Sequence, residues 1–367
     1  MATPQPVLFE STTPGALVSY IEHTTWLEVA EKYFNHVLTV LQFFGFGLNI
    51  IHFLILTRKE LRFNTVYRLM IGICFFDLIS MIATFLLWSP FFIRTPPTAE
   101  EECYLSYTYF DVWTQTYAGC VLDVTQRNTS WLALIMALFR TLSVMFPLSS
   151  IMRNLAKPRV AVWTIVIVLV ISVLWTLEAY SRFEIKPYNE DFNCDGVRIV
   201  LNETRYARVI PNESQAAHNR IVSIYGFLKA LPSLIDLILA ILLILELRKA
   251  KKRRLSIQKL DENKKDNTTK LVLFMTISFF ILEVPNGFAH IVAGFSHDFK
   301  TLLSVMYYIQ VFAEILPIIN SSSHIFVCFL MSSQYRDTAR NLFGISEMKV
   351  TMVKESGVSI HPKSSIH

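Results

Sequence analysis

The sequence predicts an all-α membrane protein, a seven-transmembrane helix bundle followed by a short amphipathic C-terminal helix. Three observations predict this fold class. Of the 367 residues, 53% are apolar and only 17% are charged, whereas soluble domains contain roughly a quarter charged residues. Seven long apolar segments follow one another along the chain. The basic residues between them gather in alternate loops, as expected when those loops face the cytosol.

Each apolar segment is long enough to cross a bilayer as a helix, which takes about 20 mainly apolar residues. The segments lack the alternation of a strand, and only helices or closed barrels satisfy the backbone in lipid. The predicted spans cover about residues 36–57, 65–89, 112–146, 160–180, 220–247, 270–294 and 301–330.

Basic residues follow the first, third and fifth spans. The largest group is the ten Lys and Arg residues within 248–270. Cytoplasmic loops carry the excess of Lys and Arg, so these loops are expected in the cytosol and the N-terminus outside the plasma membrane. The expected regions are an extracellular N-terminus 1–35, a seven-transmembrane domain 36–331, an amphipathic membrane-surface helix 332–343 and a cytoplasmic tail 344–367.

Two features of the predicted outer segments agree with this orientation. Asn202 and Asn212 each begin a glycosylation sequon between the fourth and fifth spans. Cys103 and Cys194 lie in two different outer loops, where a disulfide bond could form. Cys120 is the rival partner for Cys194, although it is expected inside the third helix. The cysteine spacing suggests no zinc site, and no metal or other cofactor is predicted.

Polar side chains at membrane depth are costly and usually mark function or helix pairing. Asn49 and Asp77 lie in the middle of the first two spans. They could form a switch that holds Na⁺ or a proton, or a static hydrogen-bonded contact. Arg140 lies at the inner end of the third span, where it could contact a G protein or extend to the membrane interface.

A ligand pocket is predicted in the outer half of the bundle. Asp123, Gln126 and Arg127 share one helical face because they are spaced i, i+3, i+4. They could bind ligand, or Asp123 and Arg127 could pair with each other. The side chains from the sixth and seventh spans that could complete the pocket are Glu283, Asn286, His290, Gln310 and Glu314.

Proline and the segment after the last span indicate further features. Pro285 removes a backbone hydrogen bond beside Gly287, so it could form a hinge or an ordinary kink. The segment SSQYRDTARNLF separates apolar from basic residues, as in a helix lying on a membrane, and Gly344 could end it. His52 is expected at an interface or in a loop.

Other function classes lack support in the sequence. There is no GxxxxGK[ST] loop, no HExxH and no nucleophile–base set, so no enzyme is predicted. The basic residues lie between apolar spans and form no basic domain for nucleic acid. Internal repeats, which are common in transporters, are also missing.

Several stretches resemble rhodopsin-like G-protein-coupled receptors across about residues 35–345. Within them, the chain looks like the nematode serpentine chemoreceptor class W group, which is similar to FMRFamide and myosuppressin peptide receptors. The most specific stretches are NTVYRLMIGICFFDLISM, TSWLALIMALFRTLSVMFPL, LRKAKKRR, TKLVLFMTISFFILEVPNG and HIFVCFLMSSQYR.

The resemblance assigns roles to particular residues. Arg140 falls on the arginine of the usual Asp-Arg-Tyr, and Cys103 and Cys194 look like the pair that forms the outer disulfide. The activation-switch positions that it indicates are Asn49, Asp77, Arg140, Phe279, Pro285 and His324.

The chain also departs from the family pattern at these positions. Phe139 replaces the acid before Arg140, Glu283 replaces the helix-six tryptophan, and His324 begins the sequence found where the helix-seven Asn-Pro-x-x-Tyr is usual. The survival of a Na⁺ site is therefore open.

The sequence leaves three functional hypotheses. The first is a receptor that binds a short extracellular neuropeptide, with or without an amidated end, and activates a heterotrimeric G protein. An acidic pocket of Asp123, Glu283 and Glu314 would suit a cationic peptide end. The second is a chemosensory receptor for small environmental molecules. The third, a transporter or channel, would need a continuous polar path. Membrane lipid is a partner in each case.

Overall fold

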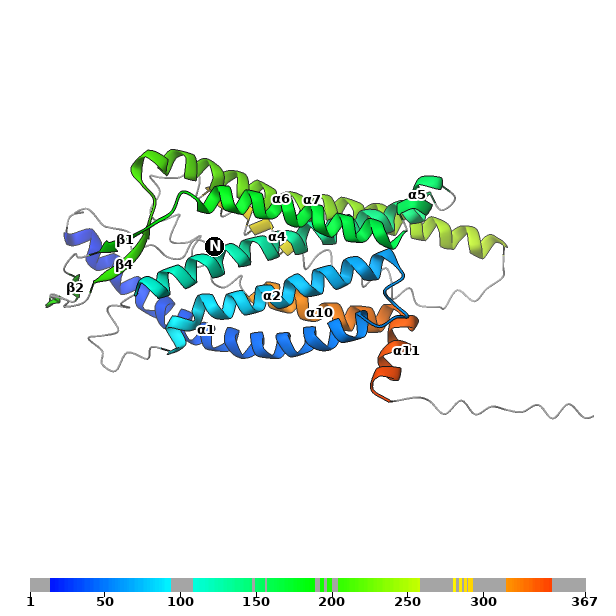
Figure 1. The fold of residues 1–367 in the computed structure, drawn as a ribbon, viewed down its shortest axis with the longest axis horizontal. Coiled ribbons are helices and arrows are strands. Elements are labelled where there is room, and N and C mark those ends of the chain that lie inside the picture. The colour runs from blue at the N-terminus through cyan, green and yellow to red at the C-terminus, as the bar shows by residue number, and fades with distance from the viewer. Residues whose placement is uncertain are drawn as a thin grey trace, which may run out of the picture.

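The structure is a computed structural model that describes residues 14–93, 108–146, 149–155, 157–188, 192–194, 197–199, 204–257 and 315–344, with short helical stretches between 280 and 292. Within these residues, five helices are long and apolar enough to cross a membrane. They are α1 (Pro14–Leu56), α2 (Thr65–Ile93), α4 (Tyr109–Met145), α6 (Pro158–Tyr180) and α7 (Asn212–Ile257). They lie alongside one another (Figure 1), which confirms the predicted helical membrane bundle.

The end of the chain adds a further apolar helix and a short helix that turns away from it. Helix α10 (Ile315–Met331) belongs to the predicted seventh span and meets α11 (Ser333–Leu342) at a bend of 100°. The remainder of that span and most of the predicted sixth span lie outside the described residues. The short stretches between 280 and 292 are the described part of the sixth span.

The first helix begins earlier than predicted. Helix α1 starts at Pro14, so the segment expected as the extracellular N-terminus is helical from that residue onward. The sequence between Gly15 and Gly45 contains no other glycine or proline that would interrupt a helix. The part apolar enough to cross a membrane still begins at His36.

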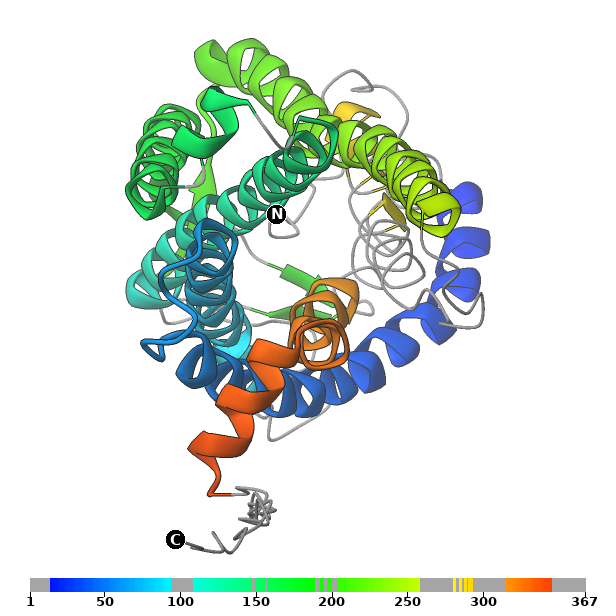
Figure 2. The ribbon, with the colours of Figure 1, turned by 90° about the vertical axis from the view of Figure 1, so that its right-hand side faces the viewer.

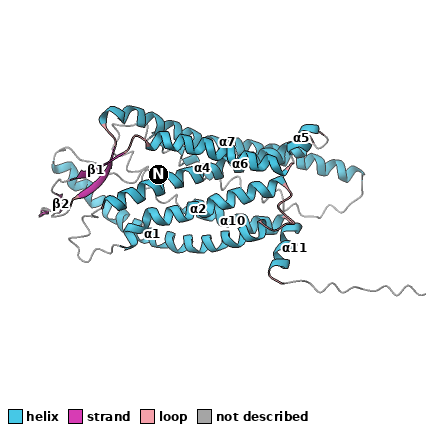
Figure 3. Cartoon of the chain, viewed as in Figure 1, coloured by secondary structure: helices cyan, strands magenta, loops and turns pink. Residues whose placement is uncertain are grey.

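Four short strands lie between α6 and α7 at one end of the bundle (Figure 3). β1 (Glu184–Tyr188) pairs antiparallel with β4 (Arg205–Val209), and β2 (Phe192–Cys194) pairs antiparallel with β3 (Val197–Ile199). These strands were not expected from the sequence. Each has five residues or fewer, too few to show a clear period of two.

The basic segments gather at the opposite end of the bundle. The loop between α1 and α2 carries Arg58, Lys59 and Arg62, and it lies at the same end as α5 (Ser150–Leu155) and α11 (Figure 1). The basic end of α7 reaches the same side, whereas Asn212 begins α7 at the end with the strands. The basic loops and the segment with the strands, which the sequence assigned to opposite sides of the membrane, therefore lie at opposite ends of one bundle.

Helix α4 is at the centre of the packing, in contact with α2, α6 and α7. Its Leu132 packs in one buried cluster with Leu69, Ile73 and Phe76 of α2 and Ala161 of α6. Viewed along the bundle, α6 lies on the outside of α4 (Figure 2). The helices therefore pack around α4, and α6 is peripheral.

The outer face of α6 is apolar and uncovered. Trp163, Ile167, Ile171 and Leu174 recur at helical spacing, and each is more than half exposed, from 55% to 66%. A face of this kind would be unfavourable in water but suits contact with lipid tails. Trp163 therefore faces outward in this structure.

Two glycines bring α7 close to the described part of the sixth span. A Cβ atom on Gly226 would lie 2.5 Å from the carbonyl oxygen of Gly287, and one on Gly287 would lie 2.8 Å from the carbonyl oxygen of Gly226. Neither position has room for a side chain without separating the two backbones. Pro285, the predicted hinge, is helical and exposed beside this contact.

Helix α11 is held against the bundle by a buried hydrogen bond. The Ser332 side chain caps α11 by accepting from the backbone N–H of Tyr335 at 3.0 Å. Gly344, with a φ of 68°, follows its C-terminal end. Tyr335 is fully buried, and its Oη lies 2.7 Å from Nδ1 of His52 in α1.

This contact corrects the expectation that His52 lies at an interface or in a loop. His52 is only 1% exposed. Burial raises the pKa of Tyr335, so its hydroxyl keeps its proton and can donate to His52. The histidine can be buried because a residue 283 positions later in the chain supplies its polar partner.

Candidate functional site

The outer half of α4 carries a buried carboxylate. Asp123 is 8% exposed, and its two oxygens accept hydrogen bonds from Tyr180 Oη of α6 at 2.9 Å and from Tyr225 Oη of α7 at 3.2 Å. The predicted direction of Asp123, into the bundle, is therefore what the structure shows. Hydrogen bonds from these two phenols to the carboxylate of Asp123 therefore join α4, α6 and α7.

Arg127 lies one helical turn further along α4 and extends toward α6. Its Nη1 donates to the backbone oxygen of Ser172 and to Oγ1 of Thr176, both at 3.0 Å. The guanidinium carbon also lies 5.1 Å from the ring centroid of Tyr225. The predicted alternative, a direct pair of Arg127 with Asp123, is not formed.

Lys229 of α7 completes this group and was missed by the sequence analysis. It is 8% exposed, and its Nζ lies 3.5 Å from Oε1 of Gln126 and 5.7 Å from the ring centroid of Tyr225. The rule that singled out Asp123, an ionisable residue inside a span, also applies to Lys229 and could have found it.

We call these side chains the outer polar cluster. Its members from α4, α6, α7 and the described part of the sixth span are Asp123, Gln126, Arg127, Tyr180, Tyr225, Lys229 and His290. His290 is buried, and its ring centroid lies 4.9 Å from that of Tyr225. The remaining predicted pocket residues Glu283, Asn286, Gln310 and Glu314 lie outside the described residues. The cluster offers hydrogen bonds and charge for recognition.

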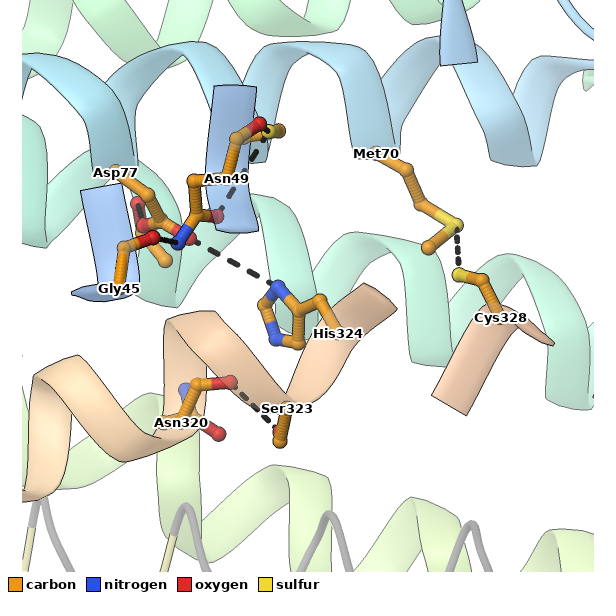
Figure 4. Close-up of polar contacts among 10 residues, drawn as sticks. Gly45, Asn49, Met70, Asp77, Asn320, Ser323, His324 and Cys328 are labelled. Atoms are coloured by element: carbon orange, nitrogen blue, oxygen red, sulfur yellow. Dashed lines mark hydrogen bonds and ion pairs between the residues drawn. The ribbon is translucent and has the colours of Figure 1, made fainter. Parts of the chain in front are cut away.

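A second group of polar side chains lies deeper in the bundle, and we call it the central polar cluster (Figure 4). Asp77 of α2 accepts from Thr129 Oγ1 of α4 at 2.9 Å, and its other oxygen lies 3.8 Å from Nδ1 of His324 of α10. Asn320 is buried one turn before His324. Asp77 thus brings together side chains from three helices.

Asn49, the first of the predicted switch residues, has different contacts. Its Nδ2 donates to the backbone oxygen of Gly45 in its own helix at 2.9 Å, and Cys74 of α2 donates to its backbone oxygen at 3.3 Å. Asn49 is therefore fixed beside Asp77 through α1 and α2 (Figure 4). The sequence indicated Asn49 and Asp77 as one group but did not show that His324 would face the carboxylate.

A cavity of about 90 Å³ extends from the central polar cluster toward the end of the bundle that carries the basic loops. It is lined by residues of α2, α4, α7 and α10, and among its polar members are Thr129, Arg140, Asp236, Asn320 and His324. Arg140 therefore shares a cavity with the residues that contact Asp77. This gives the inner arginine a spatial connection to the predicted switch.

Other predicted residues are described only in part. Cys120 lies in α4 as a free thiol, so the rival Cys120–Cys194 bridge is not formed here. The backbone of Cys194 belongs to β2, while Cys103, Asn202 and Phe279 lie outside the described residues. Among the side chains that the structure describes, no group of three or more His, Cys, Asp or Glu residues could hold a metal.

The apolar helices and the buried polar clusters between them define a multi-pass helical membrane protein. The chain belongs to the serpentine type 7TM GPCR chemoreceptor Srw family, whose model matches residues 35–346. No curated protein matches the chain. The family implies an extracellular ligand and coupling to a G protein, and it is a receptor family and not an enzyme class.

The family match separates the hypotheses drawn from the sequence. It supports the chemosensory alternative better than the neuropeptide receptor, and it carries no FMRFamide or myosuppressin specificity. It gives no support to a transporter or channel.

Proposed function

We propose that this chain is a chemosensory receptor that binds a small extracellular molecule in the outer polar cluster and activates a heterotrimeric G protein at the opposite end. The observation that supports this most strongly is the placement of three polar layers along α4. Asp123 and Arg127 belong to the outer cluster, Thr129 to the central cluster and Arg140 to the inner cavity. Helix α4 therefore carries residues of all three polar layers that lie between the proposed ligand site and the proposed G-protein end.

The mechanism is a shift between two populations of the bundle. A ligand favours the active state only by as much as it binds that state more tightly. Contacts at Asp123 and Arg127 join α4 to α6 and α7, so a ligand that changes them changes the packing of these helices. In the active state, Arg140 would be available to the G protein.

The charges of the outer polar cluster also bear on the neuropeptide hypothesis. A cationic peptide end was expected to bind an acidic pocket that includes Asp123. In the structure, Arg127 and Lys229 lie in the same cluster as Asp123, and both of its oxygens already accept phenolic hydrogen bonds. The described part of the pocket therefore carries one carboxylate and two cations, and does not have the net negative charge that favoured a cationic ligand.

The proposed orientation places the N-terminus and the strands outside the plasma membrane, with α5 and α11 in the cytosol. An epitope tag at the N-terminus should bind antibody on intact cells, and a tag at the C-terminus should bind it only after permeabilisation. Glycosidase treatment should increase gel mobility of the wild type, and replacement of Asn202 and Asn212 by Gln should remove that shift. Tags on the same face would contradict this topology.

The function itself is tested by a screen in cells that express the receptor with a promiscuous G protein. A panel of small volatile and water-soluble compounds and a library of short amidated peptides are applied with a calcium readout. We expect responses to members of the small-molecule panel. Responses to peptides alone would contradict the chemosensory proposal and restore the neuropeptide receptor.

A further inference from the structure

The outer polar cluster contains more positive than negative charge among its described side chains. Asp123 contributes one carboxylate, whereas Arg127 and Lys229 contribute two cations. We infer that the ligand of this receptor carries a carboxylate or an equivalent negatively charged group, which binds the ammonium of Lys229 with Arg127 nearby. This inference rests on the proposed function, because it names the chemical class of the ligand at the same site.

The surroundings of Lys229 are unusual for a buried ammonium. An ammonium has three hydrogen-bond donors, and burying one without a partner is costly. At 8% exposure, Lys229 makes a single side-chain hydrogen bond, to Oε1 of Gln126 at 3.5 Å. Within the described residues no carboxylate forms an ion pair with it, so it retains donors for an anion.

The other two charged side chains of the cluster, Arg127 and Asp123, make their described hydrogen bonds to residues other than Lys229. Arg127 donates to neutral oxygens, those of Ser172 and Thr176. The carboxylate of Asp123 accepts from Tyr180 and Tyr225. Among the described hydrogen bonds, the carboxylate therefore accepts from phenols, and both cations donate to neutral oxygens.

The ring of Tyr225 explains how the cluster is tolerated without a ligand. Arg127 and Lys229 lie 5.1 Å and 5.7 Å from its centroid, distances at which a ring face attracts a cation. The ring of His290 lies on Tyr225 as well, at 4.9 Å between centroids. A single aromatic side chain thus partly stabilises the buried Lys229 and the half-buried Arg127, and an anion that reached Lys229 would stabilise them further.

The test uses matched pairs of compounds on cells that express the full chain. Straight-chain and aromatic carboxylates are each compared with their primary amides, which keep the shape and lose the charge. We expect the carboxylates to activate the wild type and the amides to be weaker by about 10- to 100-fold, because a charge-assisted hydrogen bond is lost. Equal potency of acids and amides would overturn the inference.

The variant Lys229→Met keeps much of the side-chain volume and removes the charge. It should weaken the carboxylates by about 10- to 100-fold and leave the amides unchanged, while Lys229→Arg should retain the preference for acids. Lys186→Met is the control, because Lys186 is an exposed lysine of β1 at the same end of the bundle and contacts Glu184. It should leave the potency of the carboxylates unchanged.

The outcomes separate this inference from the proposed function. A Lys229→Met receptor that reaches the cell surface and keeps wild-type potency for acids would overturn the inference. If this variant does not reach the surface, the comparison of acids with amides on the wild type still decides. Responses restricted to neutral or cationic small molecules would overturn the inference alone, whereas silence toward every compound and every G protein would overturn the proposed function as well.

Discussion

Nδ1 of His324 lies 3.8 Å from Oδ2 of Asp77, so an imidazole from α10 faces the buried carboxylate of α2. Thr129 of α4 donates to the other oxygen of the same carboxylate at 2.9 Å. Helices α2, α4 and α10 therefore meet at one acidic side chain, above a cavity that Arg140 also lines. A change in the spacing of these helices would alter these contacts.

The contact between Asp77 and His324 predicts that the effects of two substitutions are not additive. Asp77→Asn and His324→Asn should each lower the melting temperature of the purified receptor, because each removes one member of the buried pair whose nearest atoms lie 3.8 Å apart, with a loss of about 0.5–3 kcal/mol. The loss of unfolding free energy in the double variant should be smaller than the sum of the losses in the two single variants, by a coupling energy of about 0.5–3 kcal/mol. Thermal unfolding in detergent measures all four proteins, and additive effects would contradict the contact.

The hydrogen bond between His52 and Tyr335 predicts a stabilising role for a single hydroxyl. Tyr335→Phe keeps the ring in its buried site and leaves Nδ1 of His52 without its partner, so we expect a loss of about 1–3 kcal/mol. The matched control is Tyr33→Phe, since Tyr33 is 71% exposed and its hydroxyl removal should change little. Equal melting temperatures for wild type and Tyr335→Phe would show that the bond does not hold α11.

The close approach of Gly226 to Gly287 predicts opposite effects of one substitution at two glycines. Alanine stabilises a helix relative to glycine by about 1 kcal/mol, so Gly47→Ala, which meets nothing within 4 Å, should be neutral or stabilising. At Gly226 the new Cβ would lie 2.5 Å from a backbone oxygen. Gly226→Ala should therefore lower the melting temperature and the amount of receptor at the cell surface. A stabilised Gly226→Ala receptor would contradict the packing.

The position of Arg140 predicts a loss of signalling without loss of ligand binding. Arg140→Ala should abolish G-protein activation by an agonist found in the screen, because Arg140 lies at the inner cavity and far along α4 from the outer polar cluster. Arg153→Ala, at an exposed arginine of α5 at the same end of the bundle, is the control. Surface expression is measured in parallel, and full signalling by Arg140→Ala would contradict its role.

The bundle and the ends of several helices could be predicted because they depend on local sequence. Apolar length indicated the spans, and Gly344 indicated where α11 ends. The extension of α1 to Pro14 and the strands between α6 and α7 were missed, since neither has a strong hydrophobic pattern.

The candidate sites were predicted in part for a related physical reason. A charged residue inside a span indicates that it faces the bundle, which holds for Asp123, Arg127 and Asp77. Its partner depends on how helices pack, and that information is not local. The contact of His52 with Tyr335 joins residues 283 positions apart, and Lys229 meets Gln126 across 103 positions. One sequence therefore gives the candidates but not their pairings.

Agonist-stimulated nucleotide exchange is the most direct test of whether this chain is a receptor that activates a G protein through Arg140. The purified receptor is placed in lipid nanodiscs with a heterotrimeric G protein, and GTP uptake is followed with and without an agonist from the screen. If Arg140 couples the ligand site to the G protein, the agonist should accelerate exchange by the wild type and not by Arg140→Ala. Exchange that never depends on the agonist, together with an ion current or solute flux through the same protein in liposomes, would contradict this proposal.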